Sequence, residues 1–216
     1  MRIPPVSAHA TSVPGSNASR FRATSLALAL MVVIAACGDT PSLKGAVRNP
    51  PLQVAQVSLP GPDGQDVAMR AAPGGLLLAY FGYTSCPDVC PTTMADISRA
   101  LTDLEPGLAE RVTVAMVTVD PERDTLERLD DYLSHFFSRR IPLRTDDSAR
   151  LADAAAAFGV QWEIEDHQPG EAYAVAHTAL TYVIDDTGTV RVEWPFGFSS
   201  EDMAADMESL LEEAQS

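Results

Sequence analysis

Cysteine, lysine and long apolar segments are all scarce in this sequence of 216 residues. Three cysteines are too few for a framework of disulfide bonds, and their odd number gives at least one of them a separate role. Lys44 is the only lysine, and 30 acidic residues outnumber 15 basic ones, for a formal net charge of −15. Because nucleic-acid binding requires clustered positive charge, we expect no nucleic-acid partner. Hydrophobic residues make up 46% of the chain, which is typical of a globular protein.

The longest apolar run belongs to an N-terminal segment typical of a bacterial secretion signal. Two arginines precede the 11 apolar residues 26–36, a length that suits a signal peptide and is too short to span a bilayer. The run ends at Ile34-Ala35-Ala36-Cys37, which resembles a lipobox. We therefore predict a lipoprotein signal peptide over residues 1–37, lipidation of Cys37, and a domain anchored to the membrane in the periplasm or on another extracytoplasmic face of the cell envelope. An ordinary signal peptide or an uncleaved anchor is the alternative.

The remaining sequence alternates between strand and helix patterns. Residues 38–50 predict a flexible tether, and residues 51–216 predict one domain. Apolar runs at 76–81 and 112–119 are typical of buried central strands, and each is followed by a helical pattern. Further strands are predicted at 54–59, near 67, and at 141–143, 175–184 and 190–194, with an insertion at 160–174; helices are predicted at 91–104, 126–137 (with Asp124 as its cap), 147–158 and from 199 or 200. This order indicates an α/β fold, a thioredoxin-like three-layer α/β sandwich with a mixed central sheet.

Cys86 and Cys90 lie between the strand at 76–81 and the helix that follows it. This places both thiols at the C-terminal edge of the sheet, where open α/β folds bind ligands. The helix N-terminus is expected to favour the thiolate of Cys90, although Asp88 opposes that effect. The spacing allows the two sulfurs to form a disulfide or to bind one soft metal ion. A purely stabilising disulfide is the alternative, but its short loop would contribute little stability.

Of the four histidines, His177 is the candidate third member of this site. His9 lies in the leader, and His135 and His167 are expected at the surface. A single histidine in a strand is usually a structural, hydrogen-bonded residue. Beside a dithiol, however, His177 completes a set of two thiolates and one imidazole, which suits copper or zinc. A structural zinc site needs a fourth cysteine or histidine, and none is obvious, so the number of ligands favours copper.

Three separated motifs resemble those of the Sco/SenC family of copper-binding, thioredoxin-like proteins. They are YFGYTSCPDVCP (80–91), VDPERDT (119–125) and HTALTYVID (177–185), and the resemblance covers roughly residues 52–214. The resemblance implies that Cys86, Cys90 and His177 bind copper, as Cu(I) and also as Cu(II). It further implies a copper chaperone that loads the CuA centre of cytochrome c oxidase subunit II, with other periplasmic copper carriers or thiol reductants as further partners.

The resemblance also leaves an enzymatic alternative open. In the family the two cysteines can form a disulfide, so a periplasmic thiol-disulfide oxidoreductase acting on partner cysteines is the second hypothesis. Dedicated oxidoreductases of this fold usually have one residue fewer between the sulfurs, and a peroxidase using Thr84 has less support. The chain departs from the family pattern at Ala176, where many relatives have an acidic residue, and at Arg144-Thr145-Asp146, where relatives often have a Gly-Leu-Thr-Gly turn. Three methionines on helical faces are predicted to be core residues: Met94, Met203 and Met207.

Overall fold

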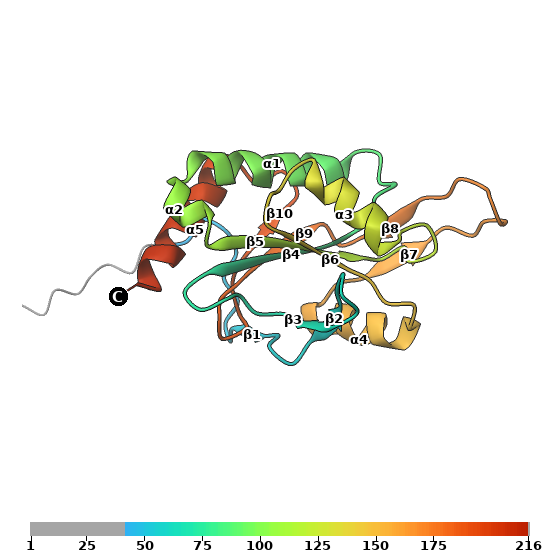
Figure 1. The fold of residues 1–216 in the computed structure, drawn as a ribbon, viewed down its shortest axis with the longest axis horizontal. Helices are drawn as coiled ribbons and strands as arrows, with labels where there is room; N and C mark the ends of the chain where they lie inside the picture. The colour runs from blue at the N-terminus through green and yellow to red at the C-terminus, as the bar shows by residue number, and fades with distance from the viewer. Residues whose placement is uncertain (1–41, 216) are drawn as a thin grey trace, which may run out of the picture. The chain divides into compact units, whose positions relative to one another are not determined.

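The computed structural model describes residues 42–215, so the predicted signal peptide and the lipidation site Cys37 lie outside the described residues. A mixed six-stranded sheet has helices on both faces, with α1, α3 and α5 on one side and α4 on the other, which confirms the predicted three-layer sandwich (Figure 1). Its strand order is β1-β10-β9-β4-β5-β6, with β1 (Leu52–Gln53), β4 (Leu76–Gly82), β5 (Val112–Thr118), β6 (Arg140–Leu143), β9 (Leu180–Ile184) and β10 (Thr189–Pro195). The helices are α1 (Val89–Asp103), α2 (Pro106–Ala109), α3 (Leu126–Ser134), α4 (Ser148–Phe158) and α5 (Ser200–Glu213).

The two central strands determine where the site lies. All seven residues of β4 are buried, as the continuous apolar run predicts for a strand covered on both faces. β4 and β5 run parallel and in register to their last residues, Gly82 and Thr118. The Val119 N–H then donates to the Gly82 carbonyl at 3.0 Å. The loop after β4, which carries Cys86, therefore lies beside the loop after β5, which carries the VDPERDT motif.

Of the helices that follow these strands, α1 begins two residues earlier than predicted, whereas α3 begins at the predicted Leu126 with a different cap. α1 begins at Val89, which places Cys90 in its first turn, where the side chain is fully buried. Thr125, and not Asp124, caps α3, because its side chain accepts a hydrogen bond from the Arg128 N–H. The expectation for Asp124 was wrong because its carboxylate is fully buried and accepts hydrogen bonds from other elements.

The two later helices agree closely with the sequence pattern. α4 is capped by Asp147, whose carboxylate accepts from two backbone N–H groups, and it ends at Gly159 in the left-handed conformation, with φ of 74°. α5 is capped by Ser199 and packs its predicted apolar face against the core. The three methionines predicted as core residues are all buried: Met94, Met203 and Met207.

The predicted strand over residues 175–184 is in fact two strands. β8 (Val175–His177) leaves the central sheet and pairs with β7 (Trp162–Ile164) in the segment predicted as an insertion. The backbone changes partners between them, since the Thr178 N–H donates to the Gln161 carbonyl whereas the Ala179 carbonyl accepts from Phe196. We call residues 162–177 the β7–β8 ribbon; it extends beyond the sheet in orange in Figure 1.

Two smaller features complete the fold. A second hairpin joins β2 (Ser58–Pro60) to β3 (Asp66–Ala68), so the strand predicted at 54–59 is shorter and lies later in the chain. Part of the predicted tether is attached to the domain, because the N–H groups of Lys44 and Gly45 donate to the buried carboxylate of Asp206. Among residues 42–215, no helix is both long and apolar enough to cross a membrane.

Candidate metal centre

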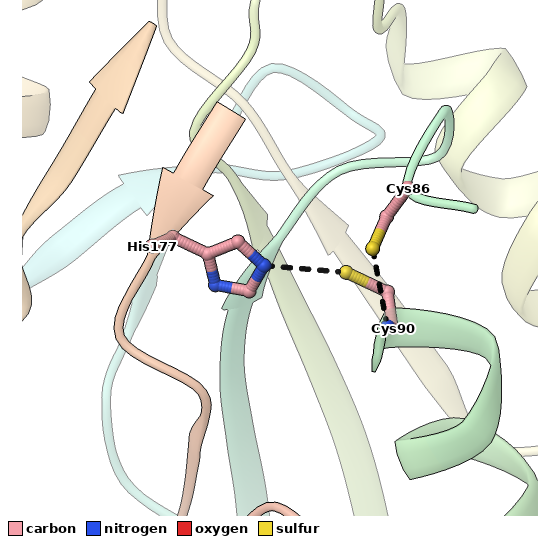
Figure 2. A group of neighbouring side chains, drawn as sticks. All are labelled: Cys86, Cys90 and His177. Carbon is pink, nitrogen blue, oxygen red and sulfur yellow. Dashed lines mark hydrogen bonds between the residues drawn. The ribbon is translucent and has the colours of Figure 1, made fainter. Parts of the chain in front are cut away.

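Three side chains from distant parts of the chain converge at the end of β4. Cys86 comes from the loop, Cys90 from the first turn of α1 and His177 from the last position of β8 (Figure 2). Their sulfur and nitrogen atoms all lie within 4.8 Å of one another. The structure thus places the three predicted residues together, and both thiols are free. Among the described residues, this group contains no fourth histidine, cysteine or carboxylate.

The hydrogen bonds of His177 determine which ring nitrogen faces the sulfurs. Nδ1 lies 3.2 Å from the Thr178 carbonyl oxygen, which can only accept, so Nδ1 carries the ring proton. Nε2 is then the unprotonated nitrogen, and it lies 3.5 Å from the Cys90 sulfur (Figure 2). Burial lowers the pKa of His177, which also favours the neutral ring. A neutral imidazole whose free nitrogen faces two thiols is ready to act as a metal ligand.

The surroundings of Cys90 favour its thiol over its thiolate. Burial raises the pKa of Cys90 to about 12, so the expectation that the helix N-terminus favours the thiolate is wrong for the metal-free protein. The dipole effect is small beside the loss of hydration of a fully buried sulfur. The Tyr80 hydroxyl donates to this sulfur at 3.8 Å, and burial keeps the pKa of Tyr80 well above its ordinary value. The Cys86 side chain is half-buried, and its sulfur accepts a hydrogen bond from the Cys90 N–H at 3.3 Å.

A buried carboxylate holds the loop that carries Cys86. Asp124 accepts hydrogen bonds from the backbone N–H and the hydroxyl of Thr84, and from the hydroxyl of Thr118 at 2.7 Å. Thr84 and Ser85 also accept from the Arg128 guanidinium. The Thr84 hydroxyl thus holds the loop to Asp124 and Arg128, and the peroxidase alternative stays a prediction from the sequence.

At Ala176 and at Arg144-Thr145-Asp146, where the chain departs from the family pattern, other contacts hold the neighbouring groups. Ala176 offers no acid to orient the histidine, and the Thr178 carbonyl takes that role by accepting from His177 Nδ1. Arg144 donates to the backbone carbonyls of Pro121 and Asp124 and thereby ties the segment after β6 to the VDPERDT loop. Both departures thus leave the geometry of the three-residue group intact.

The other histidines within the described part of the chain lie away from this group. His135 is exposed, as predicted, with Nδ1 bonded to the Asp131 carbonyl. His167 was expected to be exposed, but only 16% of its side chain is accessible because its ring stacks on Tyr173. This contact was not predictable from the acidic composition around His167.

Comparison with known proteins identifies the family of this chain. A model described as SCO1/SenC matches residues 48–212. The chain belongs to the SCO1/SenC family.

Solved structures of two SCO1/SenC proteins are similar to this chain. Apo Sco1 from Thermus thermophilus is 33% identical with a TM-score of 0.69, and the match covers 78% of this chain and 97% of that one. ScoI of Bradyrhizobium japonicum, solved with copper bound, is 31% identical with a TM-score of 0.60 and coverages of 77% and 98%. A SCO2-like protein of Rickettsia prowazekii is 35% identical over 116 residues, or 53% of this chain and 56% of that protein. The chain thus spans about half the length of the curated relatives it matches.

Sequence reasoning assigned no specific contact to several residues that shape this SCO1/SenC site, and it took Asp124 for a helix cap. The residues without an assigned contact are Tyr80, Tyr83, Asp120, Arg123 and Tyr173. Most lie within the motifs YFGYTSCPDVCP and VDPERDT, which were the only signal available. Tyr173 lies outside every motif, and its role depends on contacts made between elements.

Proposed function

We propose that this protein is a copper chaperone that binds one copper ion through Cys86, Cys90 and His177 and delivers it to the CuA centre of cytochrome c oxidase subunit II. The observation that carries this proposal is the convergence of two sulfurs and one imidazole nitrogen within 4.8 Å. Thiolates select soft ions such as Cu(I), and imidazole is an accepted copper ligand. Membership of the SCO1/SenC family and the likeness to a copper-bound relative support copper as the cargo.

Exposure suggests how the cargo leaves the site. Cys86 and His177 are half-buried, whereas Cys90 is fully buried. A thiolate or imidazole of the partner therefore reaches the metal from the side of Cys86 and His177 and replaces those ligands first. Cys90 is the last ligand to separate from copper, and its buried sulfur then regains a proton because burial raises its pKa to about 12.

The proposal places this exchange outside the cytoplasm. Lipidation of Cys37 would attach the domain to a membrane through a short segment, with the copper site in the periplasm. The partner CuA centre and other periplasmic copper carriers would then meet the site in the same compartment.

A titration of the purified, reduced chain with Cu(I) against a competing chelator tests this function. We expect one tight equivalent, lost in Cys86→Ser and Cys90→Ser. His177→Ala should weaken binding by more than the about 10–100-fold that loss of an outer contact costs. His135→Ala, which removes an exposed histidine, is the matched control and should bind like the unchanged chain. Equal binding by His177→Ala and His135→Ala would contradict the three-ligand site.

A thiol-disulfide oxidoreductase is the second candidate, favoured by the contact between the Cys90 N–H and the Cys86 sulfur at 3.3 Å. Because burial raises the pKa of Cys90, the half-buried Cys86 would be the attacking thiol. The two functions differ in their need for the imidazole. Disulfide exchange that persists in His177→Ala, in a chain without tight copper binding, would establish this second function and overturn the first.

A further inference from the structure

The ribbon that carries His177 is too small to hold its own position. Strands β7 and β8 have three residues each and pair only with one another. An isolated two-stranded hairpin is marginally stable in water. The hydrogen bond from His177 Nδ1 to the next residue is local and does not connect the ribbon to the rest of the site. Val175 packs into the core, but the ribbon also needs an anchor with contacts near its far end to keep Nε2 facing the sulfurs.

We propose that Arg123 is this anchor, a positioning residue that holds the ribbon, and with it His177, against the dithiol. As far as copper is concerned, the inference rests on the proposed function. Arg123 belongs to the VDPERDT motif. Within residues 42–215, its hydrogen bonds and ring contacts are with Asp120, Tyr83 and Tyr173, and none is with a candidate ligand.

A series of ring and guanidinium contacts connects Arg123 to His177. The rings of His177 and Tyr83 meet edge to face with centroids 5.8 Å apart. The Arg123 guanidinium lies over two tyrosine rings, 5.5 Å from the centroid of Tyr83 and 3.5 Å from the centroid of Tyr173. The His167 ring also stacks on Tyr173, at 3.6 Å, and two groups so close to one ring must lie on opposite faces. Tyr173, four residues before His177, is thus held between Arg123 and His167.

Hydrogen bonds fasten the same residues to the central sheet. Asp120, which lies two residues after the end of β5 and is fully buried, accepts from the Tyr173 hydroxyl at 2.8 Å. It also pairs with Arg123 Nε, while Arg123 Nη1 donates to the Tyr173 carbonyl at 3.0 Å. Arg123 therefore contacts the ring of Tyr173, its backbone carbonyl, and Asp120, which accepts from the Tyr173 hydroxyl.

Only arginine satisfies this set of contacts. The planar guanidinium stacks on an aromatic ring and donates in two directions at once, whereas the ammonium of lysine is a compact point charge. Arg123→Lys keeps a cation for the buried Asp120 but loses the stacking and the donor to the Tyr173 carbonyl. This substitution therefore separates anchoring of the ribbon from neutralisation of Asp120.

Hydrogen exchange of the metal-free chain gives the first test. In Arg123→Lys, two amides should exchange at least about tenfold faster, because a stacked cation and a charged hydrogen bond are lost. They are Glu165 in the ribbon, which donates to Ala174, and Thr178 directly after the ribbon, which donates to Gln161. Amides of β4 and β5 should be unchanged. Arg191→Lys is the matched control, since Arg191 is similarly half-buried but pairs with Asp185 and Glu213 away from the ribbon. Equal ribbon protection in the two variants would overturn the proposal.

A double-mutant cycle gives the second test and shows whether the effect passes through the imidazole. Arg123→Lys should weaken Cu(I) binding by about tenfold, as loss of an outer contact does, and should cause no further loss in the His177→Ala background. The same loss with and without His177 would overturn the proposal. If the unchanged chain binds no copper, the proposed function fails, while the exchange measurement still decides the role of Arg123.

Tyr173→Leu covers the case in which Arg123→Lys does not fold. It removes the clamped ring and the hydroxyl from the ribbon and leaves the ion pair of Arg123 with Asp120 in place. Faster exchange of the same two amides supports the anchor, and unchanged protection overturns it.

Discussion

Gly82 provides the sharpest test of how tightly the metal centre is packed. It is the last residue of β4, and a Cβ atom built on it would lie 2.5 Å from Tyr80 Cε1 and 3.0 Å from the Cys90 sulfur. The Tyr80 ring is fully buried and has no room to turn away. The backbone is also held, since Gly82 pairs with Thr118 and its carbonyl accepts from Val119.

Gly82→Ala therefore has to displace the Tyr80 ring, the Cys90 sulfur or the strand. Overpacking of this kind costs about 1–3 kcal/mol, and in a domain of this size about 1 kcal/mol lowers the Tm by about 2–4 °C. We expect the Tm of the metal-free protein to fall by about 2–12 °C. Cu(I) affinity should fall as well, because the displaced groups include one proposed ligand and the hydroxyl that donates to it.

Thermal unfolding followed by circular dichroism, together with Cu(I) competition, measures both effects. The control is Gly107→Ala in α2, where an added Cβ meets nothing within 4 Å and the substitution is otherwise the same. The control should melt at or slightly above the temperature of the unchanged chain, because alanine is the better helix former. If Gly82→Ala melts like the control and binds copper normally, the reasoning from packing at this site is refuted.

Two further predictions concern buried groups at the site. Asp124→Ala removes the acceptor of the half-buried Thr84 N–H and of the buried Thr118 hydroxyl, and a buried group left without a partner costs about 1–3 kcal/mol. Denaturant unfolding should therefore show a clear loss of stability against the exposed control Asp153→Ala. Equal stability of the two variants would contradict this role of Asp124. Because burial raises the pKa of Cys90 to about 12, this thiol is protonated near neutral pH and must lose its proton to bind copper. Each proton released makes binding about tenfold tighter per pH unit, so chelator competition between about pH 6 and 8 should show affinity rising with pH, and a flat profile would argue against Cys90 as a thiolate ligand.

Much of the central architecture was predictable because its signals are local. The runs that became β4 and β5 are apolar throughout, which is enough to identify strands buried on both faces. Asp147, Gly159 and Ser199 end or begin helices through contacts with their own neighbours in sequence. A pattern within a dozen residues contains the information that such elements need.

Other predictions failed where the outcome depends on partners from elsewhere in the chain. Residues 175–184 look like one strand, but the break at Thr178 follows from pairing with β7 on one side and β10 on the other. Asp124 has a sequence context suited to a helix cap, and its real partners come from the ends of β4 and β5. The pKa of Cys90 is governed by the residues that bury it and not by its place at a helix N-terminus.

By itself, the sequence determined the chemistry of the candidate centre, since two cysteines between a buried strand and a helix are a local pattern, and the three motifs single out His177 as their companion. Only the tertiary structure decided that the imidazole nitrogen lies 3.5 Å from a sulfur 87 residues away, and that the Arg123 guanidinium stacks on the Tyr173 ring of the same ribbon. The reason is physical: residue type sets what a side chain can bind, whereas its position results from packing and hydrogen bonds among segments that the linear pattern does not connect.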